Sequence, residues 1–396
     1  MTELKNKTAD VVFVSTADWD NPYWTNKQHV AIQLAKRGYK IFYVESQGLR
    51  SPTATARDAK RIFGKIKKGL RTPRKVRENL YVWCPLTIPF QKYQIVRHIN
   101  RLILNAGVNF WTKILGLKKD VFWTYSPMST AFYDLNGYKA VIYHSVDDIK
   151  AQPGMPAKAI EKFEIDLLKK ADVVFVTAPS LYDAHNLINK NVFYHSNVAD
   201  FDHFNSATND SLEIPEDVRA LKGPVVGFIG AISSYKLDFL LIKYVAELRP
   251  DINFLLIGEV GEGDPNTNVE IFEKLSNVRL LGGRPYKELP AYLKKIDVAL
   301  LPNKINDYTK AMFPMKFFEY LAAGKPVVST ELPALIAFTE VADFCNNYDD
   351  FLAAIDRRLV DIEGDVERRL KVARKYTYEY RTDLMLEILK KKTTGL

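Results

Sequence analysis

The sequence predicts an α/β fold of two doubly wound domains, and three observations support this prediction. Short runs of β-branched and aromatic residues alternate with helical patterns, which is typical of parallel sheets covered by helices on both faces. The alternation restarts after the polar stretch 205–222. The length of 396 residues fits two domains, because a domain usually holds roughly 100–200 residues. Ligands of such sheets bind beyond the carboxyl ends of the strands, so we expect a functional site in a cleft between two Rossmann-like domains.

The predicted strands form two sets, one on each side of the polar stretch. The first set covers residues 11–15, 40–45, 80–84, 121–125, 140–144, 173–177 and 192–195. The second set covers residues 225–229, 253–257, 278–281, 298–301, 326–330 and 343–345. We therefore expect a first domain at 1–205, a linker at 206–222 and a second domain at 223–375. Residues 367–392 have a helical pattern, and we treat 376–396 as a separate C-terminal helix.

Charge is distributed unevenly between the two halves of the chain. Residues 1–200 contain 30 Lys and Arg against 17 Asp and Glu, whereas the remaining residues contain 26 against 30. We therefore expect an anionic partner for the first domain, either a membrane surface or a nucleic acid. The two cysteines, Cys84 and Cys345, lie far apart in predicted strands, so neither a disulfide framework nor a zinc site is expected. No run approaches the ~18 apolar residues of a membrane span and residues 1–10 lack a signal-peptide core, which favours a cytosolic protein.

A basic stretch at residues 57–77 favours the membrane over nucleic acid. It contains ten Lys and Arg and one acidic residue, Asp58, around an apolar stripe. This pattern is typical of an amphipathic helix on an anionic bilayer, although a solvated helix face is the ordinary alternative. The residues expected to face the inner surface of the membrane are Lys60, Arg61, Phe63, Lys65, Lys67, Lys68 and Arg71. A second basic and apolar helix is expected at residues 95–117.

Residues 314–328, P-M-K-F-F-E-Y-L-A-A-G-K-P-V-V, predict a short helix followed by a buried strand. Pro314 suits the first helical turn and Gly324 suits the position that ends a helix. Lys316 and Glu319 lie three residues apart and project together from the first turns. A helix N-terminus with a lysine suits a phosphate, and a carboxylate one turn later suits the hydroxyls of a ribose. The alternative is an ordinary surface ion pair.

These features resemble the GT-B glycosyltransferases of family 4, also called glycosyl transferases group 1. Besides residues 314–328, the resemblance rests on V-V-G-F-I-G-A-I-S-S-Y-K-L-D at 225–238, on S-N-V-A-D-F-D-H-F at 196–204, and on L-A-K-R-G-Y-K-I-F-Y-V near the start. It covers nearly the whole chain and is strongest for branches that build bacterial cell-surface polysaccharides, including teichuronic-acid enzymes. It implies an acceptor-binding first domain, a donor-binding second domain, and a last helix that crosses back to the first domain.

The resemblance implies a donor site on the second domain for a nucleotide-diphosphate sugar. Glu319 would hold the ribose, while Lys236, after the turn at Gly230, would approach the diphosphate. The alternative for Lys236 is a solvent-facing residue at the start of a helix. Lys316 is a second phosphate candidate. Arg284 and Tyr286 would flank the base or the diphosphate, with a structural turn as the alternative. One departure is Ala311, which occupies the place of the first glutamate of the family pattern, so that Asp307 is the nearest carboxylate upstream.

Catalytic candidates of the first domain are His144, Asp147 and Asp148, at the end of a predicted strand. In retaining relatives a histidine near such a strand contacts the transferred sugar, and in inverting ones an aspartate is the base. The alternatives are a core histidine and a helix N-cap. The candidates for contacting the acceptor are Asp18, Trp19, Tyr23, Trp24 and Asn26, although core packing suits the aromatic rings equally well. Asp18 and Asp20 form a D-x-D pattern, but no metal is expected there.

We therefore expect a retaining glycosyltransferase that moves a hexosyl group to a lipid-linked or polysaccharide acceptor, without a cofactor. One alternative is a sugar-nucleotide epimerase or hydrolase of the same fold, which would form product without an acceptor. A second is a non-catalytic subunit that binds a nucleotide sugar. A dinucleotide-dependent dehydrogenase is disfavoured, because neither domain has G-x-G-x-x-G after its first strand.

Overall fold

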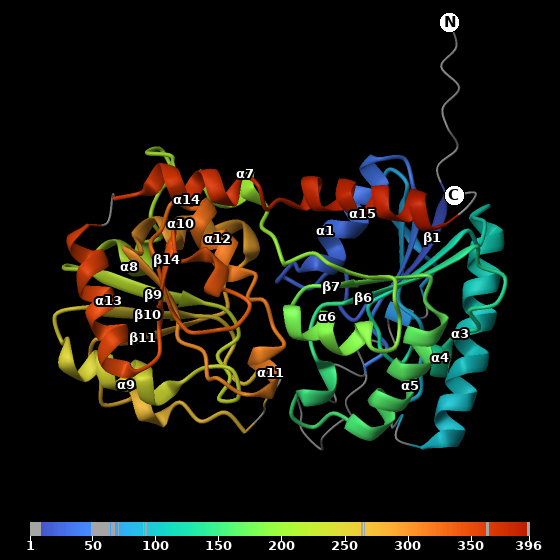
Figure 1. Cartoon of the computed structure of the whole chain (residues 1–396), viewed down its shortest axis with the longest axis horizontal. Coiled ribbons are helices and arrows are strands. Elements are labelled where there is room, and N and C mark those ends of the chain that lie inside the picture. The colour runs from blue at the N-terminus through green and yellow to red at the C-terminus, as the bar shows by residue number, and fades with distance from the viewer. Residues whose placement is uncertain are drawn as a thin grey trace, which may run out of the picture. The chain divides into compact units, whose positions relative to one another are not determined.

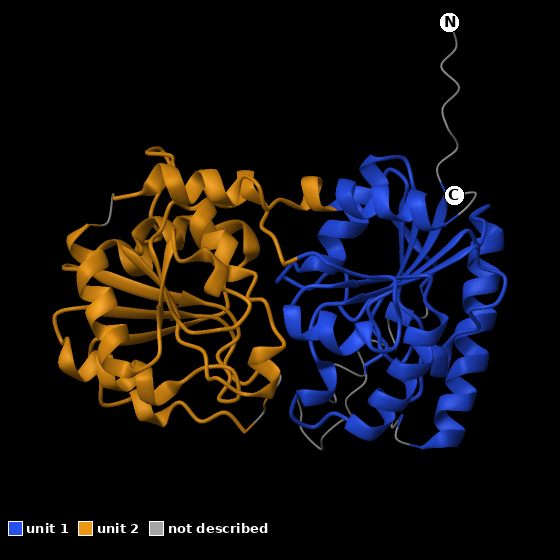
Figure 2. Ribbon diagram, viewed as in Figure 1, with its two compact units in different colours: residues 1–195, 382–396 blue, residues 196–381 orange. Residues whose placement is uncertain are grey.

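The computed structural model of the chain describes residues 9–48, 64, 68–69, 71–89, 91, 93–262, 264, 266–361 and 364–393. It divides into two compact units, shown in Figure 2. Unit 1 comprises residues 1–195 and 382–396, and unit 2 comprises residues 196–381. Each unit contains one doubly wound sheet, so the predicted GT-B architecture of two Rossmann-like domains is confirmed. The division falls between residues 195 and 196, where the sequence suggested 205.

The described part of unit 1 contains an eight-stranded sheet in the order β3-β4-β2-β1-β5-β6-β7-β8 (Figure 1). Its strands are β1 (Asp10–Val14), β2 (Lys40–Val44), β3 (Arg74–Arg77), β4 (Leu80–Trp83), β5 (Val121–Thr124), β6 (Ala140–Ser145), β7 (Val173–Val176) and β8 (Val192–Tyr194). All neighbouring strands are parallel except β3, which is antiparallel to β4. Its helices are α1 (Asn26–Lys36), α3 (Gln94–Ile114), α4 (Ser129–Phe132), α5 (Ala157–Lys170) and α6 (Pro179–Asn186).

Unit 2 contains a parallel sheet in the order β11-β10-β9-β12-β13-β14. Its strands are β9 (Val225–Ile229), β10 (Asn253–Ile257), β11 (Val278–Gly282), β12 (Val298–Leu301), β13 (Val327–Thr330) and β14 (Ala342–Cys345). The helices are α7 (Phe201–Asn205), α8 (Glu216–Arg219), α9 (Phe239–Leu248), α10 (Leu289–Lys295), α11 (Asp307–Lys310), α12 (Lys316–Ala322), α13 (Tyr348–Val360) and α14 (Val366–Ala373). Alternate strand residues pack into different cores, since Val225 joins Phe317 of α12 whereas Val226 joins Val245 of α9.

The chain leaves unit 2 through α15 (Tyr378–Lys392), whose residues from 382 onward belong to unit 1. Met385, Leu386 and Leu389 of this helix pack with Val11 of β1 and Ile32 of α1 in one buried cluster. This part of α15 therefore covers one face of the unit 1 sheet. No helix within the described residues combines the length and the apolar character needed to cross a bilayer.

Four predicted elements differ from the structure in detail. The end of the basic stretch 57–77 is not helical, because Arg74–Arg77 form the edge strand β3. The second basic helix, α3, spans Gln94–Ile114. Pro314 precedes α12 and its N-cap Met315, while Gly324, with φ of 72°, ends the helix as predicted. The helical pattern at 367–392 is broken between α14 and α15.

Candidate functional site

The first two strands of unit 2 end in glycines that lie against each other. Gly230 follows β9 and donates its N–H to the carbonyl of Ile257, 2.9 Å away. Gly258 follows β10, and a Cβ atom added to it would overlap the carbonyl oxygen of Gly230. Only glycine fits there, because its φ of 155° and the missing side chain are both needed. The carboxyl ends of β9 and β10 are thus packed backbone to backbone, at the end of the sheet where ligands of doubly wound folds bind.

Helix α12 is attached to the same end of the sheet. The hydroxyl of Tyr320 accepts a hydrogen bond of 2.8 Å from the N–H of Ile229, the residue before Gly230. Beside it, Nζ of Lys316 lies 2.6 Å from Oε2 of Glu319. The Glu319 side chain is only 3 % exposed and that of Lys316 is 21 % exposed. Burial of the carboxylate argues against the alternative of an ordinary surface pair, because surface pairs keep both charges in water.

Tyr286 and His203 form a wall next to this ion pair. Their rings stack with centroids 4.4 Å apart, and Nε2 of His203 lies 3.0 Å from the carbonyl oxygen of Tyr286. Burial, followed by the negative charge of Glu319, raises the pKa of the Tyr286 phenol, so it stays neutral. Phe204 packs edge-on against Tyr286, and Nζ of Lys316 lies 5.9 Å from the centroid of Phe204. His203 was not among the predicted site residues, although it lies in the motif 196–204.

The two other predicted cations of the donor site have different surroundings. Nζ of Lys236 lies 5.3 Å from the ring centroid of Tyr235 and 5.5 Å from that of Tyr308. The backbone carbonyl of Lys236 accepts a hydrogen bond of 2.9 Å from the N–H of Lys304. Lys236 is therefore positioned by the loop after β12. Arg284 is instead bound by Asp217, 2.8 Å from Nη2, and by the hydroxyl of Tyr292, 2.6 Å from Nε. These contacts match the alternative in which Arg284 stabilises a turn and does not bind the donor.

The catalytic candidates of unit 1 lie at and beyond the end of β6. His144 is fully buried, with its ring stacked on Tyr125 at 4.6 Å and packed against Trp123 and Phe175. This environment favours the core-histidine alternative. Asp147 and Asp148 are half-buried in the loop that follows. Burial raises the pKa of the Asp148 carboxyl, and this residue precedes a 3₁₀ turn at Ile149–Ala151 without a side-chain capping bond.

The predicted acceptor residues divide into buried and half-exposed members. Trp19 is 7 % exposed and packs edge-on against Tyr43, and Asn26 is buried at the start of α1. Trp24 packs on Trp19 with centroids 5.7 Å apart. Asp18 and Tyr23 remain half-buried. Core packing therefore describes Trp19 better than stacking on a sugar.

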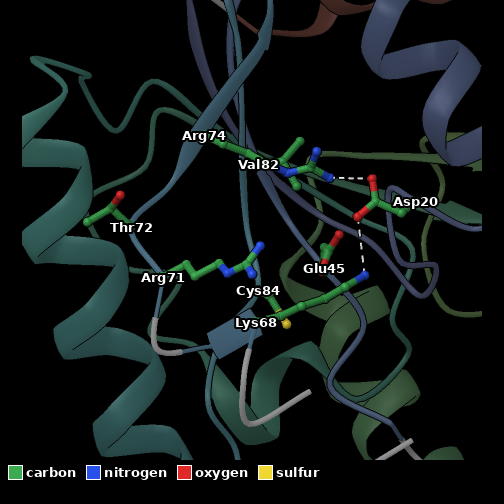
Figure 3. Close-up of a pocket in the computed structure, with 8 residues that line it drawn as sticks. All are labelled: Asp20, Glu45, Lys68, Arg71, Thr72, Arg74, Val82 and Cys84. Carbon is green, nitrogen blue, oxygen red and sulfur yellow. Dashed lines mark hydrogen bonds and ion pairs between the residues drawn. The ribbon is translucent and has the colours of Figure 1, made fainter. Parts of the chain in front are cut away.

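A pocket of about 470 Å³ lies beside these residues in unit 1 (Figure 3). It is lined by Asp20, Glu45, Lys68, Arg71, Thr72, Arg74, Val82 and Cys84. The carboxylate of Asp20 is bound by Lys68, 3.2 Å away, and by Arg74. Burial raises the pKa of this carboxyl, but the bonds to the two cations outweigh burial and lower the pKa. Asp20 of the D-x-D pattern thus pairs with two cations. The described residues contain no group of three or more side chains suited to holding a metal ion.

Glu45 of this pocket was not among the predicted site residues. Its carboxylate is 2 % exposed and accepts a hydrogen bond of 2.9 Å from the N–H of Trp19. Burial and the nearby charge of Asp18 raise its pKa. Glu45 could have been identified from its position directly after β2, at the end of the sheet where ligands bind. Of the residues predicted to face a membrane, Lys68 and Arg71 line the pocket, whereas Lys60, Arg61, Phe63, Lys65 and Lys67 lie outside the described residues.

A buried polar network occupies the opposite face of β6 from His144. The hydroxyl of Tyr143 donates to Oε1 of Glu164 at 2.6 Å, and Nε2 of His185 lies 3.1 Å from Oγ of Ser145 and 3.8 Å from Oε1 of Glu164. Burial lowers the pKa of His185 to about 4 and raises that of Glu164. At neutral pH the imidazole is therefore uncharged.

The region that carries the glycine junction and α12 matches a known family. Residues 223–361 fit the family model described as glycosyl transferases group 1. By this match, residues 223–361 resemble a group 1 glycosyltransferase domain. Over 118 residues the chain is 43 % identical to the putative teichuronic acid biosynthesis glycosyltransferase TuaH of Bacillus subtilis. That match covers 30 % of this chain and 29 % of TuaH. The resemblance inferred from the sequence motifs is thus confirmed.

Solved structures resemble the chain over nearly its whole length. The α,α-trehalose 6-phosphate synthase of Burkholderia multivorans has a TM-score of 0.68 at 12 % identity, covering 97 % of this chain and 98 % of that one. Anabaena HepE, solved in complex with UDP-glucose, has a TM-score of 0.65 at 14 % identity, covering 96 % and 99 %. At such low identity these likenesses establish the fold.

Proposed function

We propose that the protein is a glycosyltransferase that moves a sugar from a nucleotide-diphosphate sugar to a lipid-linked or polysaccharide acceptor, in the synthesis of a bacterial cell-surface glycan. The observation that supports it best is the glycine junction at Gly230 with the Lys316–Glu319 pair attached beside it. The family of residues 223–361, the naming of TuaH for teichuronic acid biosynthesis and the UDP-glucose bound to HepE agree with this proposal.

In this proposal unit 2 binds the donor. Glu319 accepts hydrogen bonds from the ribose hydroxyls, and the neutral Tyr286 beside it packs on the nucleoside. Lys236 and Lys316 approach the diphosphate and stabilise the charge that develops on the leaving nucleotide as the glycosidic bond breaks. Backbone near Gly230 gives the phosphates a close approach. Since two lysines supply the positive charge, the reaction as we propose it uses no metal ion or cofactor.

Unit 1 binds the acceptor in the same proposal. Asp147 and Asp148 follow a strand at its carboxyl end, where catalytic groups of doubly wound sheets collect. We propose transfer of a hexosyl group with retention of configuration. The place of the absent first glutamate is Ala311, which is buried, and the exposed carboxylate nearest in sequence is Asp307 at the start of α11. We therefore assign contact with the donor sugar to the segment around Asp307.

Release of nucleotide from UDP-, GDP-, dTDP- and ADP-sugars, measured with and without a lipid extract, tests the proposal. We expect one donor to be consumed faster when lipid is present, and Glu319→Ala and Lys236→Ala to reduce that rate by roughly a hundredfold or more. Glu340→Ala, an exposed change in the same unit, is the matched control and should retain the rate. Wild-type rates in both site variants would refute the residue assignments. Binding of a nucleotide sugar without turnover under any condition would favour the non-catalytic alternative.

Retention of configuration is tested by a separate measurement. A proton NMR spectrum of the product sugar gives its anomeric configuration, which is compared with that of the donor. An inverted product would exclude retention while leaving the transferase assignment intact. Equal turnover without any acceptor would instead indicate a hydrolase or an epimerase.

A further inference from the structure

Helix α3 exposes large apolar residues on one face and buries Asn100, Leu104, Val108 and Thr112 on the other. The side chains of Ile95, Leu102, Phe110 and Ile114 are 65 %, 59 %, 56 % and 63 % exposed. We call these four residues, together with Ile99 and Ile103, the outward stripe. They recur at helical spacing along Gln94–Ile114, so that they share one face. A contiguous exposed face of this kind marks an interaction surface, because scattered single residues would not align.

The buried face of α3 is held in a way that prevents the helix from turning its stripe inward. The side chain of Asn100 donates to the carbonyl of Ile88 at 2.9 Å and accepts from its N–H at 2.7 Å. Asn105 bonds to the carbonyl of Phe132 at 3.0 Å. At Gly107 a Cβ atom would overlap the ring of Trp83, so the helix backbone lies directly on this side chain. Figure 1 shows α3 along the outside of unit 1, beside α4.

The charged residues of the segment that carries the stripe have one sign, whereas the exposed Asp134 approaches α3 at Asn105, which is not a residue of the stripe. Residues 79–119 contain six Lys and Arg and no Asp or Glu. Lys113 is exposed and lies on the same side of α3 as Ile95, five turns away, and Lys118 is exposed just after the helix. Exposed apolar side chains on a segment whose charged residues are all cations match the chemistry of an anionic lipid surface, whose interior takes the apolar groups and whose headgroups take the charge.

We propose that the outward stripe of α3 is the surface through which the protein lies on an anionic lipid bilayer. The inference rests on the lipid-linked acceptor of the proposed function, because a lipid-linked acceptor lies in a bilayer, but it uses no residue of the donor site. The alternative partner, a second copy of the chain, would place two identical basic faces against each other in a symmetric dimer, and the repulsion between them would oppose that contact.

Sedimentation of the full chain with phospholipid vesicles tests this proposal. The probes are vesicles of phosphatidylcholine alone and of phosphatidylcholine with phosphatidylglycerol. We expect binding to the anionic vesicles that weakens with salt, and little binding to the neutral ones. The double variant Leu102→Ser with Phe110→Ser should lower the partition coefficient by roughly a hundredfold, since each side chain loses about the burial energy of one apolar residue.

The matched control is Leu187→Ser with Val360→Ser, which removes two apolar side chains of 82 % and 91 % exposure that lie outside the stripe. It should bind vesicles as the wild type does. A second variant, Lys113→Gln with Lys118→Gln, should lose the preference for anionic vesicles. Both apolar variants should keep the wild-type rate of donor breakdown in the absence of lipid, which separates failure of this surface from failure of the proposed chemistry.

Three outcomes of the vesicle experiment would overturn the proposal. These are equal binding of the stripe variant and the control variant, equal binding of the wild type to neutral and anionic vesicles, and no binding at all. Sedimentation velocity without vesicles tests whether the outward stripe instead binds a second copy of the chain. A wild-type dimer that the stripe variant converts to a monomer would assign the face to self-association and refute the bilayer.

Discussion

Lys316 and Glu319 form an ion pair of 2.6 Å whose carboxylate is almost completely withdrawn from water. A buried charge that loses its partner is costly, whereas an exposed one is not. The pair therefore contributes to the stability of unit 2 as well as to the proposed donor site.

The first prediction concerns this pair. Glu319→Gln should lower the free energy of unfolding by about 2 kcal/mol, because Lys316 keeps a polar neighbour but loses the charge. Lys316→Met should cost more, since it leaves the more deeply buried carboxylate unpaired. A double-mutant cycle by urea unfolding should give a coupling energy of about 1 kcal/mol or more. A coupling near zero would show that the two side chains act independently.

The second prediction concerns the glycine junction. Gly258→Ala should lower the free energy of unfolding by about 3 kcal/mol or more, because the new methyl group overlaps the carbonyl of Gly230 and the φ of 155° is strained for alanine. Gly282→Ala is the control, since its φ of 70° is also positive but a Cβ there meets nothing within 4 Å. It should cost about 1 kcal/mol. Equal losses in thermal unfolding would show that strain alone, without overlap, accounts for the effect.

The third prediction concerns the anchoring of α3. Asn100→Ala removes both hydrogen bonds to Ile88, so we expect a loss of about 2 kcal/mol from backbone groups left without partners. Asn109→Ala on the same helix changes an exposed side chain and should be within about 0.5 kcal/mol of the wild type. Chemical unfolding of both variants checks the difference. A neutral effect of Asn100→Ala would mean that water replaces the lost bonds.

The fourth prediction is a pH dependence of stability from the network behind β6. The folded pKa of His185 is about 4, below its usual 6.5, so the unfolded chain binds more protons between these values. The contribution of His185 to the free energy of unfolding is complete above about pH 6.5. It falls as the pH drops towards 4, by at most about 3 kcal/mol. The raised pKa values of Glu164 and Asp148 act in the opposite direction, since their contributions are lost as the pH rises.

The contribution of His185 is obtained by difference. Unfolding free energies of the wild type and His185→Gln, measured between pH 4 and pH 7, should diverge from each other across this window. The wild type should lose more stability on acidification than the variant. Parallel curves would show that the imidazole of the folded protein titrates normally.

The strands of the two sheets were predicted closely, with one exception that has a physical reason. Buried parallel strands consist of β-branched and aromatic residues, and these runs are visible in the sequence. Arg74–Arg77 form an edge strand whose side chains are mostly exposed, so no apolar signal marks it. The same basic residues that blunt an edge strand also suit an amphipathic helix, which explains the wrong prediction for the end of the stretch 57–77.

The candidate site was predictable only where its partners are close in sequence. Lys316 and Glu319 are three residues apart on one helix, so their pairing follows from helical spacing. Arg284 is bound by Asp217, 67 residues earlier, and no sequence pattern announces that contact. His144 ends among aromatic rings contributed by other strands, which sequence position alone does not reveal. The helical spacing of α3 likewise leaves open which apolar residues are buried, since Leu104 and Val108 are buried whereas Leu102 and Phe110 are exposed.

The return of α15 into unit 1 has a consequence for biosynthesis. Met385, Leu386 and Leu389 belong to the core formed by β1 and α1, but a ribosome adds them only after all of residues 196–381. Unit 2 can therefore fold during synthesis while one apolar face of unit 1 is still uncovered. During that interval the first-made unit depends on the last-made helix, and a chain that stops early exposes the face permanently to chaperones and proteases.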